Sequence, residues 1–229
     1  KLKHFVSKEA FNIDGLGKKI IEGFWKLEII KFPQDIFKLD YKKIEKLEGW
    51  GSLSVENLKY SINQKKKISL ERFIFALGIR HIGLENAKLL SKYFSSFLEF
   101  QNLSKTKNYN DLLNIDGIGE TQVNSIKSFF VNKINLTVLD KLGKILEIKD
   151  YIATNQNGLL KNKSFLVTGK LNGISRAEVK SLIEENSGIT VSTVSNKLNY
   201  LVTGEKPTRR KVESAKELKI KIINQDEFL

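Results

Sequence analysis

One short pattern occurs four times in the first two thirds of the chain, and this repeat constrains the fold more than any other feature of the sequence. Each copy starts with isoleucine or leucine and ends with an apolar residue followed by glycine, and three copies also have glycine at the third position. We number the copies hairpins 1 to 4, and they occupy residues 13–17, 47–51, 79–83 and 115–119. A pattern that recurs at a period of about 30 to 40 residues predicts repetition of one supersecondary unit.

Apolar residues flank every copy in one common register. Counted from the final glycine, they lie seven residues before it and four and seven residues after it, which is helical spacing. These positions are Ala10, Ile21, Phe24, Ile44, Val55, Leu58, Ala76, Ala87, Leu90, Leu112, Val123 and Ile126. Each copy is therefore predicted to join two amphipathic helices by a tight turn, in a helix-hairpin-helix unit.

The hairpin turns are the candidate binding sites. The first glycine can supply a positive φ, and the second lets a ligand approach the backbone closely. The unpaired N–H groups that open the second helix, together with the helix dipole, can bind a phosphate oxygen without reading a base. The predicted phosphate-binding residues are Gly15, Gly17, Lys18, Lys19, Gly49, Gly51, Arg80, His81, Gly83, Gly117 and Gly119.

Two features of the hairpins leave alternatives open. Ordinary tight turns in a helical repeat array would also contain such glycines, although four copies on a basic chain favour binding. Hairpin 4 is followed by Glu120 and Thr121, which makes it the least basic of the four. His81 replaces the glycine of the other copies, which predicts a different turn conformation there. His81 is either a phosphate contact or, as we favour, a structural turn residue.

Net charge is compatible with a polyanionic partner but does not establish one. The chain has 39 Lys plus Arg against 26 Asp plus Glu, a formal charge of +13. Most of the basic residues are lysines, which a genome rich in A and T also produces. The position of the charges beside the hairpins therefore carries more weight than their number.

Composition excludes several kinds of site. The chain has no cysteine and two histidines, which excludes disulfides, thiolate catalysis and cysteine-ligated metals, and we identify no catalytic or metal-binding residue. No stretch approaches the roughly 18 consecutive apolar residues of a membrane span, and no secretory signal is present. We expect a soluble cytoplasmic protein with no membrane partner. Because the sequence contains no methionine, we also expect it to be part of a longer chain.

Residues 2–10 (LKHFVSKEA), 13–17 (IDGLG) and 73–83 (FIFALGIRHIG) resemble the tandem helix-hairpin-helix domain of bacterial NAD-dependent DNA ligases. In that family the first segment follows a four-cysteine zinc finger, so the resemblance implies a C-terminal part lying just beyond it. It implies NAD, magnesium and zinc for the full-length family, but no cofactor in this part. The family's Lys-x-Asp-Gly motif, which accepts adenylate, is absent, because Asn12 and Asn114 stand where its lysine would be.

Strand and helix signals alternate in the last third of the chain. Strands are predicted at residues 164–168, 189–191, 200–203 and 221–223, and helices at 175–186 and 210–218. This order predicts a small α/β domain with a parallel four-stranded sheet. We expect a mainly α helix-hairpin-helix domain at residues 1–150, a polar linker at 151–160 and the α/β domain at 161–229.

The second domain resembles a BRCT domain. The resemblance rests on Thr168-Gly169 after the first strand, Ser175-Arg176 at the first helix, and the segment 195–202, although the usual tryptophan of the last helix is missing. Some BRCT domains bind phosphate, which implies such a role for Thr168, Gly169 and either Arg210 or Lys211. A strand end, a turn and a solvated helix start are the competing structural interpretation of these residues.

Together these features predict a protein that binds duplex DNA without sequence specificity. As part of an NAD-dependent DNA ligase in replication and repair, it would hold a nick for upstream catalytic domains of the same chain, near the bacterial nucleoid, and would be inactive alone. One alternative is a non-enzymatic repair scaffold whose hairpins bind DNA and whose BRCT domain binds a phosphorylated protein. A purely structural helical array is another.

Overall fold

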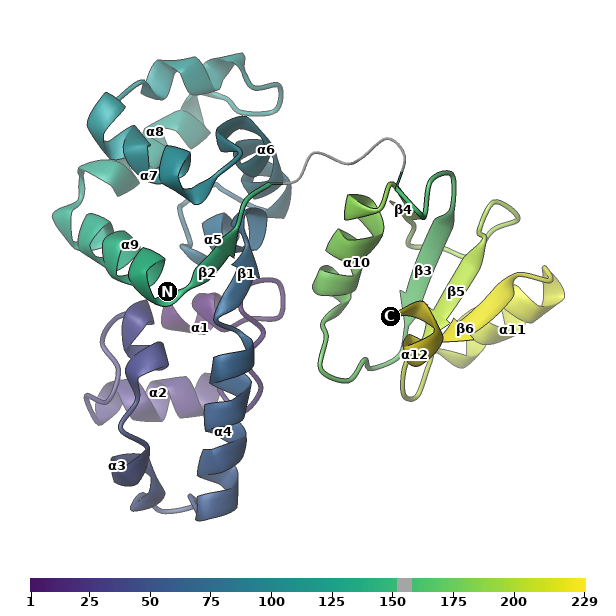
Figure 1. Cartoon of the computed structure of the whole chain (residues 1–229), viewed down its shortest axis with the longest axis horizontal. Helices are drawn as coiled ribbons and strands as arrows, with labels where there is room; N and C mark the ends of the chain where they lie inside the picture. The colour runs from purple at the N-terminus through teal and green to yellow at the C-terminus, as the bar shows by residue number, and fades with distance from the viewer. Residues whose placement is uncertain (152–157) are drawn as a thin grey trace. The chain divides into compact units, whose positions relative to one another are not determined.

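The chain forms two compact units, Lys1–Tyr151 and Ile152–Leu229 (Figure 1). The computed structural model describes residues 1–151 and 158–229. Residues 152–157 of the predicted linker lie outside the described residues. The end of that linker packs with the second unit, because the Leu160 N–H donates to the Asn186 carbonyl at 3.0 Å.

Helices dominate the first unit (Figure 1). Its elements are α1 (Leu2–Phe5), α2 (Lys18–Lys26), the 3-10 helix η1 (Pro33–Lys38), α3 (Tyr41–Glu45), α4 (Ser52–Gln64), β1 (Lys67–Ser69), α5 (Leu70–Ala76), α6 (Leu84–Phe94), α7 (Phe97–Thr106), the 3-10 helix η2 (Tyr109–Asn114), α8 (Glu120–Val131), α9 (Lys133–Ile145) and β2 (Glu147–Lys149). Helices α2, α4, α6 and α8 each begin directly after the final glycine of a hairpin, as the repeat predicts.

The apolar positions that recur in all four hairpin units lie in the core of the first unit. All twelve flanking apolar positions are buried, none more than 7% exposed. They belong to one continuous hydrophobic cluster that runs through the whole unit. Because three residues of every hairpin unit are anchored in this cluster, burial fixes where each turn sits.

The first helix of the hairpin unit is less regular than predicted. In hairpin 3 it is α5, and in hairpin 2 it is the short α3, but in hairpin 4 it is the 3-10 helix η2 and in hairpin 1 residues 6–11 form turns. Segment 108–114 (NYNDLLN) is rich in Asn and Asp, whose side chains compete with helical backbone bonds. Before hairpin 1, the bond from Ala10 N to Ser7 O spans only three residues.

A two-stranded parallel sheet, which the sequence did not predict, joins distant parts of the first unit. Strand β1 pairs with β2 in the register Lys67 to Glu147 and Ser69 to Lys149. An ion pair between Lys67 Nζ and Glu147 Oε1, 2.5 Å apart, lies at one end of this ladder. The pairing ties the segment between hairpins 2 and 3 to the end of the unit.

The second unit is the predicted α/β domain. Its elements are β3 (Ser164–Thr168), α10 (Arg176–Glu185), β4 (Ile189–Thr190), β5 (Tyr200–Thr203), α11 (Arg209–Glu217), β6 (Lys221–Asn224) and α12 (Gln225–Phe228). The strands form one parallel sheet in the order β4-β3-β5-β6, which confirms the predicted fold class. Alternate residues of β3 face two cores: Phe165 packs with Val179 of α10, and Leu166 with Ala215 of α11.

Candidate nucleic-acid interface

The four hairpin turns share one backbone geometry. The third residue of each has a positive φ, at 83° in Gly15, 79° in Gly49, 61° in His81 and 89° in Gly117. In every copy the first residue's carbonyl accepts from the fourth residue's N–H, at 3.0 to 3.3 Å. A positive φ at the third position with this bond is typical of a type II turn.

The expectation of a different turn at His81 is therefore wrong. Ile79 and Ile82, the apolar residues that bracket the turn, are each 5% exposed, so the core holds both ends of hairpin 3 in place. Histidine is among the non-glycine residues that enter the left-handed region more readily. Burial of the two isoleucines outweighs the strain at one exposed residue.

All eleven predicted phosphate-binding residues of the hairpins are exposed. At Gly17, Gly51 and Gly83 an added Cβ would meet nothing within 4 Å. The backbone at the start of α2, α4 and α6 is thus open to an approaching ligand, as the hypothesis of close backbone approach requires.

The hairpins differ in whether their N-terminal donors are free. The Gly51 N–H donates to Ser54 Oγ at 2.9 Å, and the Gly119 N–H donates to Gln122 Oε1 at 3.2 Å. At Gly17 and Gly83 the backbone N–H has no such partner within residues 1–151 and 158–229. The third helical residue decides the outcome, because serine and glutamine there reach back to the glycine. Hairpins 1 and 3 therefore offer more free donors than hairpins 2 and 4.

Charge separates the hairpins further. Lys18 and Lys19 occupy the first two positions of α2, both exposed and, within the described part of the chain, without an ion pair. Arg80 is exposed at hairpin 3, whereas Asp116 and Glu120 make hairpin 4 acidic. Hairpin 1 also carries one acidic residue, Asp14, but it combines free donors with two cations, so we expect it to be the strongest anion site of the four.

An acidic residue on α2 is matched by a nearby lysine. The Lys3 ammonium hydrogen-bonds the Glu22 carboxylate. That bond, with the lysine's charge, holds the pKa of Glu22 below its usual value. Glu22 therefore stays ionised with its charge paired, while Lys18 and Lys19 remain available at the helix start.

The hairpins pack in pairs. Gly15 of hairpin 1 lies against Leu58 of α4, where an added Cβ would be 3.5 Å from Leu58 Cδ1. Gly117 of hairpin 4 lies against Leu89 of α6 in the same way, and an added Cβ would be 3.0 Å from Leu89 Cδ1.

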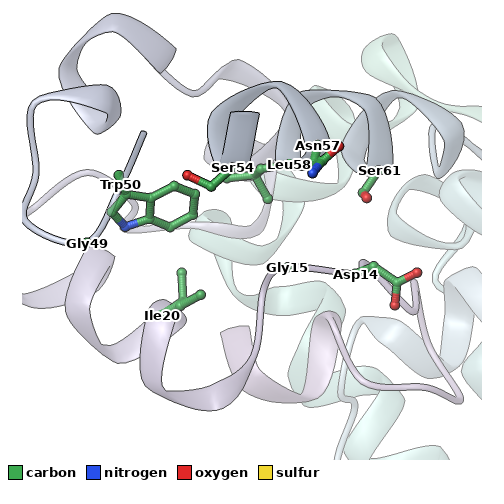
Figure 2. Close-up of a pocket in the computed structure, with 9 residues that line it drawn as sticks. All are labelled: Asp14, Gly15, Ile20, Gly49, Trp50, Ser54, Asn57, Leu58 and Ser61. Atoms are coloured by element: carbon green, nitrogen blue, oxygen red, sulfur yellow. The ribbon is translucent and has the colours of Figure 1, made fainter. Parts of the chain in front are cut away.

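A pocket of about 480 Å³ lies between hairpins 1 and 2 (Figure 2). It is lined by Asp14, Gly15, Ile20, Gly49, Trp50, Ser54, Asn57, Leu58 and Ser61. We did not predict this pocket from the sequence, although the spacing of Ser54, Asn57 and Ser61 along α4 was a signal for it.

The second unit encloses two of its predicted phosphate ligands. Thr168 is 1% exposed, and its Oγ1 accepts from the Thr208 N–H at 3.2 Å. The Gly169 carbonyl accepts from Arg176 at 2.9 Å, and an added Cβ would lie 2.8 Å from the Glu205 carbonyl oxygen. These contacts favour the structural interpretation of Thr168 and Gly169, which lock the end of β3 to the segment before α11.

The basic residues of α11 lie at the surface. Arg210 is exposed and Lys211 is half-buried, and the neighbouring Arg209 pairs with Glu213 at 2.8 Å. With the Thr168 hydroxyl buried and engaged, these cations have no exposed hydroxyl from the end of β3 to complete the predicted phosphate site.

In the described part of the chain, no group of three or more His, Cys, Asp or Glu side chains could hold a metal ion. None of the described helices has the length and apolar character needed to cross a bilayer.

Each of the two units is similar to a known protein motif or domain. A family model described as the helix-hairpin-helix motif matches residues 72–139, and the BRCA1 C-terminus (BRCT) domain model matches residues 155–229. The chain is 64% identical over 229 residues to a DNA ligase of Pelagibacter ubique strain HTCC1062 and covers 34% of it. It is 42% identical over 241 aligned residues to a DNA ligase of Rickettsia rickettsii strain Sheila Smith and covers 35% of it. The chain thus spans about a third of the length of the relatives it matches.

Proposed function

Because the chain is similar over its full length to the C-terminal part of bacterial DNA ligases, and combines a helix-hairpin-helix region with a BRCT domain, we propose that it grips a nicked duplex for such an enzyme. The complete enzyme would act in replication and repair, with NAD as its adenylate donor. This part contributes no nucleophile and holds the DNA for the catalytic domains.

One observation carries the proposal. Four turns of the same geometry expose their tips, and hairpin 1 presents free backbone donors beside Lys18 and Lys19. Backbone N–H groups and lysine cations bind phosphate oxygens, which are the same at every position of the duplex. The grip therefore fixes position along the backbone and does not specify sequence.

Such a grip assists sealing by positioning. Joining a nick requires the 3′ hydroxyl and the activated 5′ phosphate to be aligned, and holding reactants in place removes much of the entropic barrier. A helical unit in which three buried apolar residues anchor each hairpin suits that task. The chain would speed up sealing because its binding to the DNA backbone holds the two reacting groups in alignment.

Salt dependence tests the grip directly. If the hairpins contact roughly four to six phosphates, log affinity falls against log salt concentration with a slope of about −4 to −5. The measurement is fluorescence anisotropy of the full chain with a labelled nicked duplex, repeated with an unrelated sequence to test specificity. A salt-independent interaction, or no binding at low salt, contradicts the proposal.

The scaffold alternative has less support. It requires the second unit to capture a phosphorylated protein, yet the Thr168 hydroxyl is buried and already accepts a backbone hydrogen bond. Titration of the chain with phosphoserine and matched unphosphorylated peptides distinguishes the two functions. Selective binding of the phosphopeptide would revive the scaffold hypothesis.

A further inference from the structure

The pocket between hairpins 1 and 2 has two unlike sides. Ile20, Leu58 and the ring of Trp50 form an apolar side, while Asp14, Asn57 and Ser61 provide polar groups (Figure 2). The polar residues Asn57 and Ser61 lie on one face of α4, across the pocket from Asp14 in the turn of hairpin 1. A volume of about 480 Å³ is in the range of small-molecule sites.

The polar side chains of the pocket have unused hydrogen-bonding capacity. Ser54 is engaged, since its hydroxyl donates to the Gly51 carbonyl at 2.8 Å. The side chains of Asp14, Asn57 and Ser61 make no hydrogen bond or ion pair with any residue in the described ranges 1–151 and 158–229. Asp14 and Asn57 are exposed and Ser61 is half-buried, so water meets their hydrogen bonds, and a ligand that enters the pocket can replace that water.

Charge and shape define the ligand. The Asp14 carboxylate accepts hydrogen bonds and repels a phosphate, so the pocket itself is not another phosphate cradle. Trp50 is half-buried and is held by Phe24, with ring centroids 5.5 Å apart at an interplanar angle of 32°. A fixed aromatic ring beside amide and carboxylate groups suits a flat heterocycle with donors on its edge, which describes a nucleobase.

We propose that this pocket receives one unstacked nucleobase of the DNA strand held at hairpin 1, an inference that rests on the proposed DNA grip. The base stacks against Trp50, and its edge pairs with Asn57 and Asp14. Because a carboxylate accepts from an exocyclic amino group, adenine, cytosine and guanine bind better than thymine. The hairpins then hold the strand by its phosphates while the pocket holds it by one base.

The pocket is tested first without DNA. The chain has two tryptophans, so Trp25→Phe leaves Trp50 as the single reporter. Free adenosine, which carries no phosphate, should quench Trp50 emission saturably, and thymidine should bind at least about fivefold more weakly. Asn57→Ala should weaken adenosine binding at least about fivefold, as expected for loss of a paired edge. Asn63→Ala, an exposed position on α4 that does not line the pocket, is the matched control.

The second arm uses the DNA. Pairs of adjacent 2-aminopurines are placed at successive positions of a nicked duplex, and their exciton circular dichroism is lost where the chain separates the two bases, whatever the extruded base then stacks on. We expect this loss at one position with the parent chain and with Asn63→Ala, and no loss with Asn57→Ala. Absence of saturable adenosine quenching, or of any loss of the 2-aminopurine exciton signal, overturns the inference. Nicked-duplex binding with the predicted salt slope but without either signal refutes the base pocket alone, whereas absence of DNA binding refutes the grip as well.

Discussion

Replacing Gly17 by serine should separate the DNA grip from the stability of the fold. Gly17 is the N-cap of α2, with φ of −65° and ψ of 167°, a conformation that serine adopts without strain. An added Cβ meets nothing within 4 Å. Serine is a better N-cap than glycine by a few tenths of a kcal/mol. We therefore expect unchanged or slightly higher stability, about 0.5 kcal/mol at most, which is a shift of about 1–2 °C in Tm.

DNA binding should respond in the opposite direction. The serine Oγ would accept from the first-turn N–H groups of α2, which are the donors we assign to a phosphate. A hydrogen bond to a charged group contributes about 1.5–3 kcal/mol, so the Kd for nicked duplex should rise at least about tenfold. Fluorescence anisotropy at fixed low salt measures the Kd, and thermal unfolding of the same preparation measures the stability.

Two matched variants control for position and for folding. Gly119→Ser makes the same change at hairpin 4, where Asp116 and Glu120 repel a phosphate, so the Kd should change less. Gly15→Ala places a side chain at φ of 83° and should destabilise the first unit by about 1 kcal/mol or more. An unchanged Kd for Gly17→Ser, or an equal loss for Gly119→Ser, would refute the assignment of the α2 donors to phosphate.

Three further changes test other parts of the structure. The double variant Lys18→Ala, Lys19→Ala should make the slope of log affinity against log salt concentration shallower by about 1.8, as measured by fluorescence anisotropy. An unchanged slope would show that neither lysine contacts a phosphate. His81→Gly removes the backbone strain of a non-glycine residue at φ of 61°, so the free energy of unfolding measured in urea should rise by about 0.5–1 kcal/mol. A lower free energy of unfolding would contradict the assignment of strain to His81. Ser175→Ala removes the Oγ that accepts from Glu178 N at 3.1 Å, and the second unit should lose about 1 kcal/mol in urea unfolding, with Ser175→Thr restoring most of it.

The repeat was readable from sequence because the same physical constraints act in every copy. Buried apolar residues at fixed distances from the final glycine set the register, and all twelve are in the core. The left-handed third residue also follows from the sequence where it is glycine. The identity of His81 led to a wrong prediction, because the buried residues Ile79 and Ile82 hold the turn, and the other copies also have apolar residues at these two positions.

Features that depend on distant segments could not be predicted. Three-residue strands such as β1 and β2 carry no local signal strong enough to reveal a pairing between Lys67 and Glu147. The role of Thr168 likewise depends on Thr208, because the Thr208 N–H donates a hydrogen bond to the Thr168 hydroxyl oxygen. A hydroxyl and a glycine after a strand have the same sequence whether they face a phosphate or a neighbouring loop, so only the fold distinguishes the two roles.

Four turns of one geometry need not be four equal binding sites, because different residues control the turn and the ligand. The turn requires apolar anchors packed against the core and a left-handed third residue, and all four hairpins meet this requirement, although Leu47, Trp50 and Ile115 are only half-buried. Phosphate binding also requires free N-terminal donors and a favourable charge, which depend on the residues after the final glycine. Ser54 and Gln122 each occupy one donor, the glycine N–H, in hairpins 2 and 4, whereas Lys18 and Lys19 add positive charge at hairpin 1. We therefore expect phosphate binding to be strongest at hairpin 1, with support from hairpin 3, and weakest at hairpin 4.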